Sequence, residues 1–143
     1  MTAVLLPLLR ASCPPDAGGY GGSVELRMPD AEAEQLGGAE LLRSALRAAA
    51  RQLGWKVETH ALVGTRHGTM VGVVDRREAP AAFAEAVQRD MNRRMRAAVD
   101  RVGRPGAAPP APAPATDPRM PTVAFRTAYA EARQTESAPG SDA

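Results

Sequence analysis

Apolar and polar residues follow regular patterns through the middle of the chain and lose them near both ends. Residues 23–28 alternate polar and apolar, which predicts a short strand with three apolar side chains on one face. Leucines and alanines recur every three or four residues over 39–53, which predicts an amphipathic helix that stops at Gly54. The middle of the chain is therefore expected to fold.

A hairpin and a second helix are expected next. Residues 55–63 and 69–75 alternate or carry β-branched residues, and the glycine-bounded turn 64–68 separates them, which predicts a β-hairpin. Beyond Pro80, apolar residues recur at helical spacing up to Val102, which predicts a long helix. The predicted order is β-α-β-β-α.

The two ends have the composition of loops and linkers. Glycine and proline dominate residues 11–22, and proline and alanine dominate residues 104–118. The expected fold class is therefore α+β, a small β-α-β-β-α module. We expect a flexible N-terminal segment (1–22), a small α+β domain (23–102) and a disordered Pro/Ala-rich tail (103–143).

Length and composition limit what such a chain can be. It has 143 residues, a mass of 15.0 kDa and five aromatic side chains, and the predicted ordered part is about 80 residues. A core of that size is marginal, which argues against a multi-domain enzyme or a β-sandwich. A homodimer would cover leftover apolar surface and is expected on that ground.

Charge is distributed unevenly along the chain. The formal net charge of +2 divides into −3 over residues 1–35, +6 over 36–104 and −1 over 105–143. A basic centre between acidic flanks favours a polyanionic partner. All but one of the 18 basic residues are arginine, which suits phosphate contacts, although a genome-wide codon bias explains the same preference.

The spacing of the arginines indicates where such a partner would bind. Six of them recur at helical spacing or sit at the hairpin tip, and they are the predicted nucleic-acid-binding residues, for DNA or RNA: Arg43, Arg47, Arg51, Arg66, Arg89 and Arg93. If the two helices lie side by side, both stripes form one surface. A solvated helix face produces the same pattern, so this alternative stays open.

A winged-helix arrangement is one way these residues would meet DNA. Residues 31–36 and 39–53 would form the helix-turn-helix, and the hairpin would be the wing with Arg66 at its tip. Against it, the first helix is very short and the second is rich in alanine, with few side chains that read bases. The element order also lacks the three strands that a double-stranded-RNA-binding domain needs between its helices.

Signals for catalysis, metals and cofactors are missing from the sequence. The chain has neither a phosphate-binding loop nor a nucleophile elbow, and its single cysteine, Cys13, lies in a loop-like segment. His60 and His67 with Glu58 match no standard zinc spacing and are interpreted as solvated side chains. We therefore expect no enzyme activity, no metal and no cofactor.

Two further expectations concern location and the tail. No stretch reaches the ~20 apolar residues that cross a bilayer, and the N-terminus lacks the basic start of a signal peptide, so a cytoplasmic protein without membrane contact is expected. Phe125 and Tyr129 form an apolar island behind a proline-rich spacer. They are the predicted partner-binding residues of the alternative function, a protein–protein adaptor that docks its tail on a partner or on this domain.

Overall fold

The computed structural model describes residues 1–102 and 119–137. Within those ranges the elements are α1 (Thr2–Ser12), β1 (Ser23–Met28), α2 (Asp30–Gln35), α3 (Ala39–Gln52), β2 (Val57–Thr65), β3 (Gly68–Asp75), α4 (Ala81–Val102) and α5 (Met120–Ser137). The predicted α+β class is confirmed, as are the strand at 23–28, the hairpin and the two long central helices.

The three strands form an antiparallel sheet in the order β1-β3-β2. β3 is the central strand because it pairs with β2 through the hairpin and with β1 on its other side. Alternation along β3 places Val71 and Val73 on one face, where both are fully buried. The pairing partner of β1 is therefore β3.

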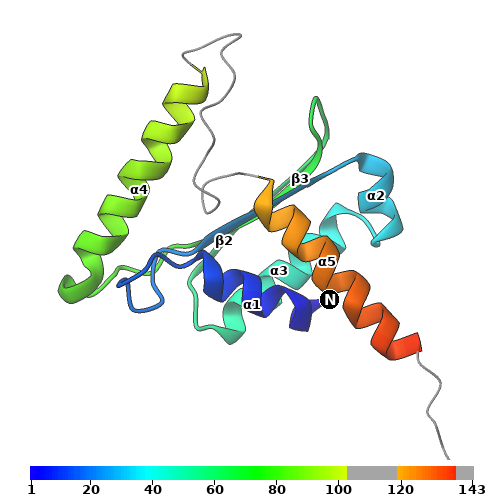
Figure 1. Ribbon diagram of the computed structural model, residues 1–143, viewed down its shortest axis with the longest axis horizontal. Coiled ribbons are helices and arrows are strands. Elements are labelled where there is room, and N and C mark those ends of the chain that lie inside the picture. The colour runs from blue at the N-terminus through cyan, green and yellow to red at the C-terminus, as the bar shows by residue number, and fades with distance from the viewer. Residues whose placement is uncertain (103–118, 138–143) are drawn as a thin grey trace, which may run out of the picture.

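Helices α1, α3 and α5 cover one face of this sheet (Figure 1). The core lies between the helices and the sheet, and α1, α3, α5, β1 and β3 all contribute apolar side chains to it. These are Leu5, Leu9, Val24, Leu26, Met28, Leu42, Leu46, Val71, Val73 and Phe125. Ten such side chains, each removed from water, supply the main stabilisation of the fold.

The N-terminal segment is a helix, so the expectation of a flexible stretch over residues 1–22 is wrong for α1. Leu5 and Leu9 are fully buried in the core, with α3 and α5 on either side. Pro7 lies inside the helix, where its missing N–H and its ring weaken the first turns, but its side chain is exposed. Burial of the two leucines outweighs this unfavourable local propensity.

Part of the predicted disordered tail is also helical. Residues Met120–Ser137 form α5, whose Pro121 occupies the first turn, where a proline is tolerated. Phe125 is fully buried, and this burial anchors the helix against α1 and β1. The remaining tail residues, 103–118 and 138–143, lie outside the described residues.

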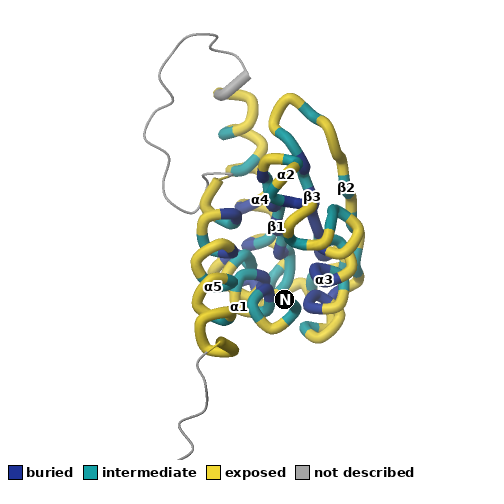
Figure 2. The backbone as a smooth tube through the Cα atoms, turned by 90° about the vertical axis from the view of Figure 1, so that its right-hand side faces the viewer, coloured by how far each residue is buried: buried dark blue, intermediate teal, exposed yellow. Residues whose placement is uncertain are grey.

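Helix α4 extends from the opposite side of the sheet (Figure 1). Its first turns are attached through Phe83, which stacks on Tyr20 with ring centroids 6.1 Å apart. Further along the helix, the Arg94 Nη2 group donates to the Ser12 carbonyl oxygen of α1 at 3.0 Å. Beyond this point most residues of the helix are exposed (Figure 2).

Candidate binding site along strand β2

The two edge strands of the sheet, β1 and β2, have different neighbours on their outer sides. At the β1 edge the Arg27 backbone N–H donates to Thr122 Oγ1 of α5 at 2.8 Å, so this edge is covered. Within the described part of the chain, β2 pairs with β3 alone. Figure 2 shows β2 along one border of the molecule with α3 beside it, whereas α5 lies toward the other border. The outer edge of β2 is therefore open.

The register shows which backbone groups of β2 point outward. The Arg76 N–H donates to the Lys56 carbonyl at 2.7 Å, so these two residues form a hydrogen-bonded pair. Such pairs alternate with non-bonded ones along an antiparallel ladder. The residues whose N–H and C=O groups face away from β3 are consequently Val57, Thr59 and Ala61.

Three arginines of α3 lie along this edge. The Arg47 Nη2 group donates to Thr59 Oγ1 at 3.2 Å, which places the arginine directly beside the middle of β2. Arg43 and Arg51 stand one helical turn before and after it on the same side of the helix. We call Arg43, Arg47 and Arg51 the α3 arginine row.

The row retains most of its positive charge for a partner. Within the described residues, Arg47 and Arg51 form no ion pair, and Arg43 pairs only with the exposed Glu40 at 3.2 Å. Exposed pairs of that kind contribute little, because water already solvates both ions. The Arg43 Nε atom is in addition buried with no hydrogen-bond partner among the described residues.

The hairpin tip carries a fourth predicted arginine. Arg66 is exposed in the turn between β2 and β3, where its Nε donates to His67 Nε2 at 2.9 Å. The turn requires Gly68, whose φ is +78° and whose Cβ, if it had one, would lie 2.3 Å from the Met28 carbonyl oxygen. Arg66 therefore stands at the far end of β2, beyond the row.

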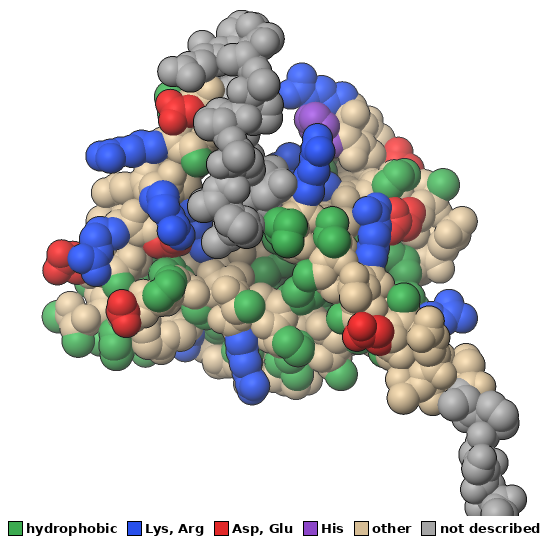
Figure 3. All heavy atoms as spheres, viewed as in Figure 1, with side chains coloured by type: hydrophobic (Ala, Val, Ile, Leu, Met, Phe, Trp, Pro, Cys, Tyr) green, Lys and Arg blue, Asp and Glu red, His purple; other side chains and the backbone are tan. Residues whose placement is uncertain are grey.

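The structure does not bring the two remaining predicted arginines to this edge. Arg89 and Arg93 belong to α4, on the other side of the sheet from α3. Arg89 pairs with Glu85 at 3.6 Å, and Arg93 pairs with Asp90. Basic and acidic side chains are interspersed along α4 in Figure 3. The single surface expected from both stripes is therefore not formed by the described residues.

The predicted partner-binding residues of the tail face the chain's own core. Phe125 is fully buried, and its ring stacks on that of Tyr129 with centroids 5.6 Å apart. A bidentate pair between Arg126 and Glu32 of α2 holds the same helix, with Nε–Oε1 at 2.6 Å, and this hydrogen bonding raises the pKa of Arg126. Phe125 reaches a partner only if α5 leaves the domain, so its partner-binding role stays a prediction.

The histidines considered as metal ligands have other neighbours. His60 Nε2 lies 3.0 Å from Glu25 Oε2 on the face of the sheet opposite the core, and Glu58 forms an ion pair with Arg76 at 2.7 Å. That pair lowers the pKa of Glu58, first through the hydrogen bond from Arg76 and then through its charge. Among the described residues, no cluster of three His, Cys, Asp or Glu side chains is placed to hold a metal ion.

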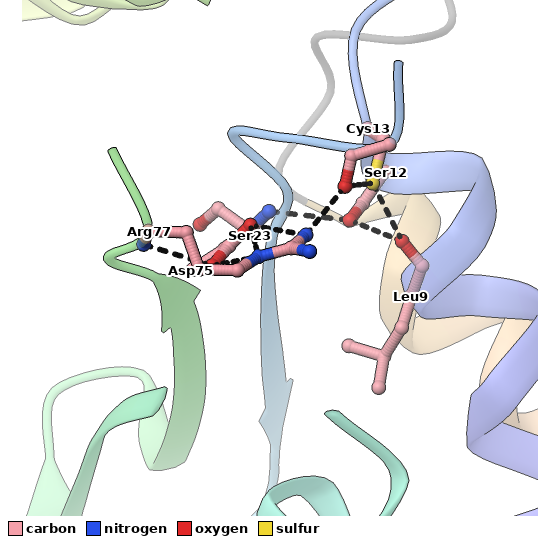
Figure 4. Close-up of polar contacts among 7 residues, drawn as sticks. Leu9, Ser12, Cys13, Ser23, Asp75 and Arg77 are labelled. Atoms are coloured by element: carbon pink, nitrogen blue, oxygen red, sulfur yellow. Dashed lines mark hydrogen bonds and ion pairs between the residues drawn. The ribbon is translucent and has the colours of Figure 1, made fainter. Parts of the chain in front are cut away.

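A buried polar cluster ties α1 to the end of β3 (Figure 4). The Asp75 carboxylate accepts hydrogen bonds from Arg77, with Nη2–Oδ2 at 2.8 Å, and Arg77 also donates to the Gly19 carbonyl at 2.7 Å. Cys13 Sγ lies 3.4 Å from the same carbonyl oxygen. Burial, followed by the charge of Asp75, raises the pKa of the Cys13 thiol, which opposes a nucleophilic role for it.

Comparisons with protein-family models, with curated proteins and with solved structures found no match. Within the described residues, no helix has the length and apolar character needed to span a bilayer. The open edge of β2 and the arginines beside it are the features of this chain that suit a binding site.

Proposed function

We propose that this protein is a non-enzymatic interaction module that binds a polyanionic partner along the outer side of β2, through the α3 arginine row. The observation that supports the proposal best is the placement of Arg47 on Thr59, because it sets a row of cations beside an open strand edge. Guanidinium groups bind carboxylates and phosphates with paired hydrogen bonds, so either anion suits the row.

A nucleic acid is the partner class that the arginine spacing first predicted. Arginines one helical turn apart are separated by about 6 Å along the helix axis, which lets each one contact a different phosphate of a single strand. Three such contacts would give a salt dependence with a slope of about −2 in log K against log salt. Arg66 would extend the contact beyond the end of β2.

The experiment measures binding of fluorescent polyanions by anisotropy at low salt. The probes are a single-stranded oligothymidylate and a peptide of alternating glutamate and valine. The variant R43Q/R47Q/R51Q removes the row, and we expect it to weaken binding by about tenfold or more, because each lost charge-assisted hydrogen bond costs roughly 1.5 kcal/mol or more.

A matched control is the variant R89Q/R93Q, which removes two predicted arginines of α4 and leaves β2 unchanged. We expect near wild-type affinity from it. If the α4 variant loses binding and the row variant keeps it, the site is on α4 and the proposal is wrong. If neither probe binds at low salt, the polyanion-binding function is itself refuted.

A further inference from the structure

We infer that the partner is an extended acidic segment of another protein, which adds to β2 as a fourth strand. This inference rests on the proposed function, because it uses the same arginine row, and it adds the hydrogen-bonding groups of the strand edge. It names a mode of binding, strand addition, in which backbone bonds supply affinity and side chains on alternate positions supply specificity.

The two edges of the sheet differ in how they are covered. Open edges present unpaired N–H and C=O groups, and proteins cover them, shorten them or interrupt them with proline. Here α5 covers the β1 edge through Thr122, whereas β2 has no proline and, among the described residues, no strand or helix hydrogen-bonded along its outer edge. Its register is regular from Val57 to Leu62 and shifts between Leu62 and Thr65, so the open stretch is residues 57–62. Its outward groups on Val57, Thr59 and Ala61 are therefore available to another strand.

The spacing of the arginines in the row matches the spacing of side chains on one face of a strand. Two residues of a strand advance about 6.6 Å and four residues of a helix advance about 6 Å. Because a short connection joins the end of α3 to the start of β2, the helix runs back along the strand. From Arg51 through Arg47 to Arg43 the row thus runs in the direction of β2 in steps of about two strand residues, with Arg47 at Thr59. Acidic side chains at every second position of an added strand would match that spacing.

The opposite side of an added strand would meet different side chains. On the face away from the core, β2 presents Glu58, His60 and Leu62, and Leu62 is 52% exposed. An apolar residue beside Leu62 would cover that surface. The expected partner segment therefore alternates acidic residues with residues of mixed or apolar character.

The observations favour such a segment over a nucleic acid. Proteins that bind single strands stack bases on aromatic side chains. None of the five aromatic residues is free beside the row, because Trp55 is 5% exposed and the other four stack in pairs, Tyr20 on Phe83 and Phe125 on Tyr129. A nucleic acid would also leave the outward backbone groups of β2 unpaired.

A second copy of this chain fits the edge less well. Pairing of two β2 strands about a two-fold axis would bring two α3 arginine rows onto the same enlarged sheet, beside each other. Repulsion between the like charges of the two rows opposes that arrangement, whereas the acidic side chains of a partner strand would neutralise the row. Charge complementarity thus selects an acidic strand as the occupant.

The test uses the full chain and three nine-residue peptides of equal charge that alternate glutamate and valine. One is unmodified, and the other two carry N-methyl groups on odd or on even amides. Only one of those sets faces β2 in a strand complex, so we expect one methylated peptide to lose affinity by more than about tenfold and the other to bind like the parent. Amide hydrogen exchange should show new protection at Val57, Thr59 and Ala61 in the complex, with 1:1 stoichiometry by sedimentation.

Other outcomes contradict the inference in distinguishable ways. If both methylated peptides bind like the parent, if oligothymidylate binds as well as the peptide, and if the edge amides gain no protection, binding is by charge alone. The proposed function then stands and the added strand is refuted. If the peptide instead promotes a dimer of this chain, the edge accepts a second copy. If no probe binds and R43Q/R47Q/R51Q behaves like the wild type, both proposals fail.

Discussion

Two adjacent arginines, Arg76 and Arg77, have opposite structural roles although the sequence presents them as equivalents. Arg76 pairs with Glu58 on the surface, where the two side chains are 53% and 61% exposed. Arg77 pairs with Asp75, whose side chain is fully buried, and its guanidinium also lies 4.4 Å from the centroid of the Tyr20 ring. The difference arises because alternation along β3 places Asp75 on the same face as Val71 and Val73, so its carboxylate is buried and needs a cation there.

We predict that Arg77→Gln destabilises the fold by about 3 kcal/mol, because it leaves the Asp75 carboxylate buried without its cation. The free energy of unfolding from urea titration measures the loss. Arg76→Gln is the matched control, and it should change that free energy by no more than about 0.5 kcal/mol. Equal effects of the two substitutions would contradict the assignment of the buried pair.

At the scale of helices and strands, the sequence predicts the elements with regular patterning and misses those with broken patterning. The hairpin follows from alternation on either side of the turn, and α3 follows from its leucine stripe. Helix α1 contains Pro7 and α5 follows a proline-rich stretch, so local propensity argues against both. Their helices depend on burial of Leu5, Leu9 and Phe125, which is a tertiary effect.

A signal for both missed helices exists in the spacing of their apolar residues. Leu5 and Leu9 in α1, and Phe125 and Tyr129 in α5, are four residues apart, as one face of a helix requires. Such short signals cannot be separated from chance without knowing which surface covers them. The covering surface comes from distant segments, because α1 packs against α3 and α5, and α5 packs against α1 and β1 at the other end of the chain.

We predict that Phe125→Ala destabilises the domain by about 3–5 kcal/mol, because it empties a fully buried site between α5 and the sheet. Thermal or urea unfolding of the full chain provides the measurement. Val123→Ala serves as the control on the same helix, since Val123 is 48% exposed, and it should cost about 0.5 kcal/mol or less. An unchanged stability of the Phe125 variant would show that α5 does not pack on the domain in solution.

At the scale of the whole molecule, the sequence predicts which arginines share a helix face but not which strand edge lies beside them. Helical spacing identifies Arg43, Arg47 and Arg51 as one stripe, and the same rule finds Arg89 and Arg93. Only the strand order β1-β3-β2 makes β2 an edge, and this order results from packing of β1 against β3. The sequence therefore could not distinguish the stripe beside an open edge from the one on α4.

The arginine row also has a consequence for self-association. An open strand edge tends to pair with a second copy, and charges beside the edge oppose this pairing. In β2 the edge itself carries no inward-pointing charge, since Val57, Thr59 and Ala61 occupy the core side. Repulsion between two copies at this edge would therefore come mainly from α3.

We predict that R43Q/R47Q/R51Q self-associates more strongly than the wild type, because it removes that repulsion and leaves the edge open. Sedimentation velocity at about 0.15 M salt, where the Debye length is about 8 Å, should show a larger dimer fraction for the variant across a concentration series. R89Q/R93Q removes two positive charges from α4, against three for the row variant, and should sediment like the wild type, which would show that a lower net charge alone does not cause association. A row variant that stays as monomeric as the wild type would mean that the edge of β2 is protected by something other than these arginines.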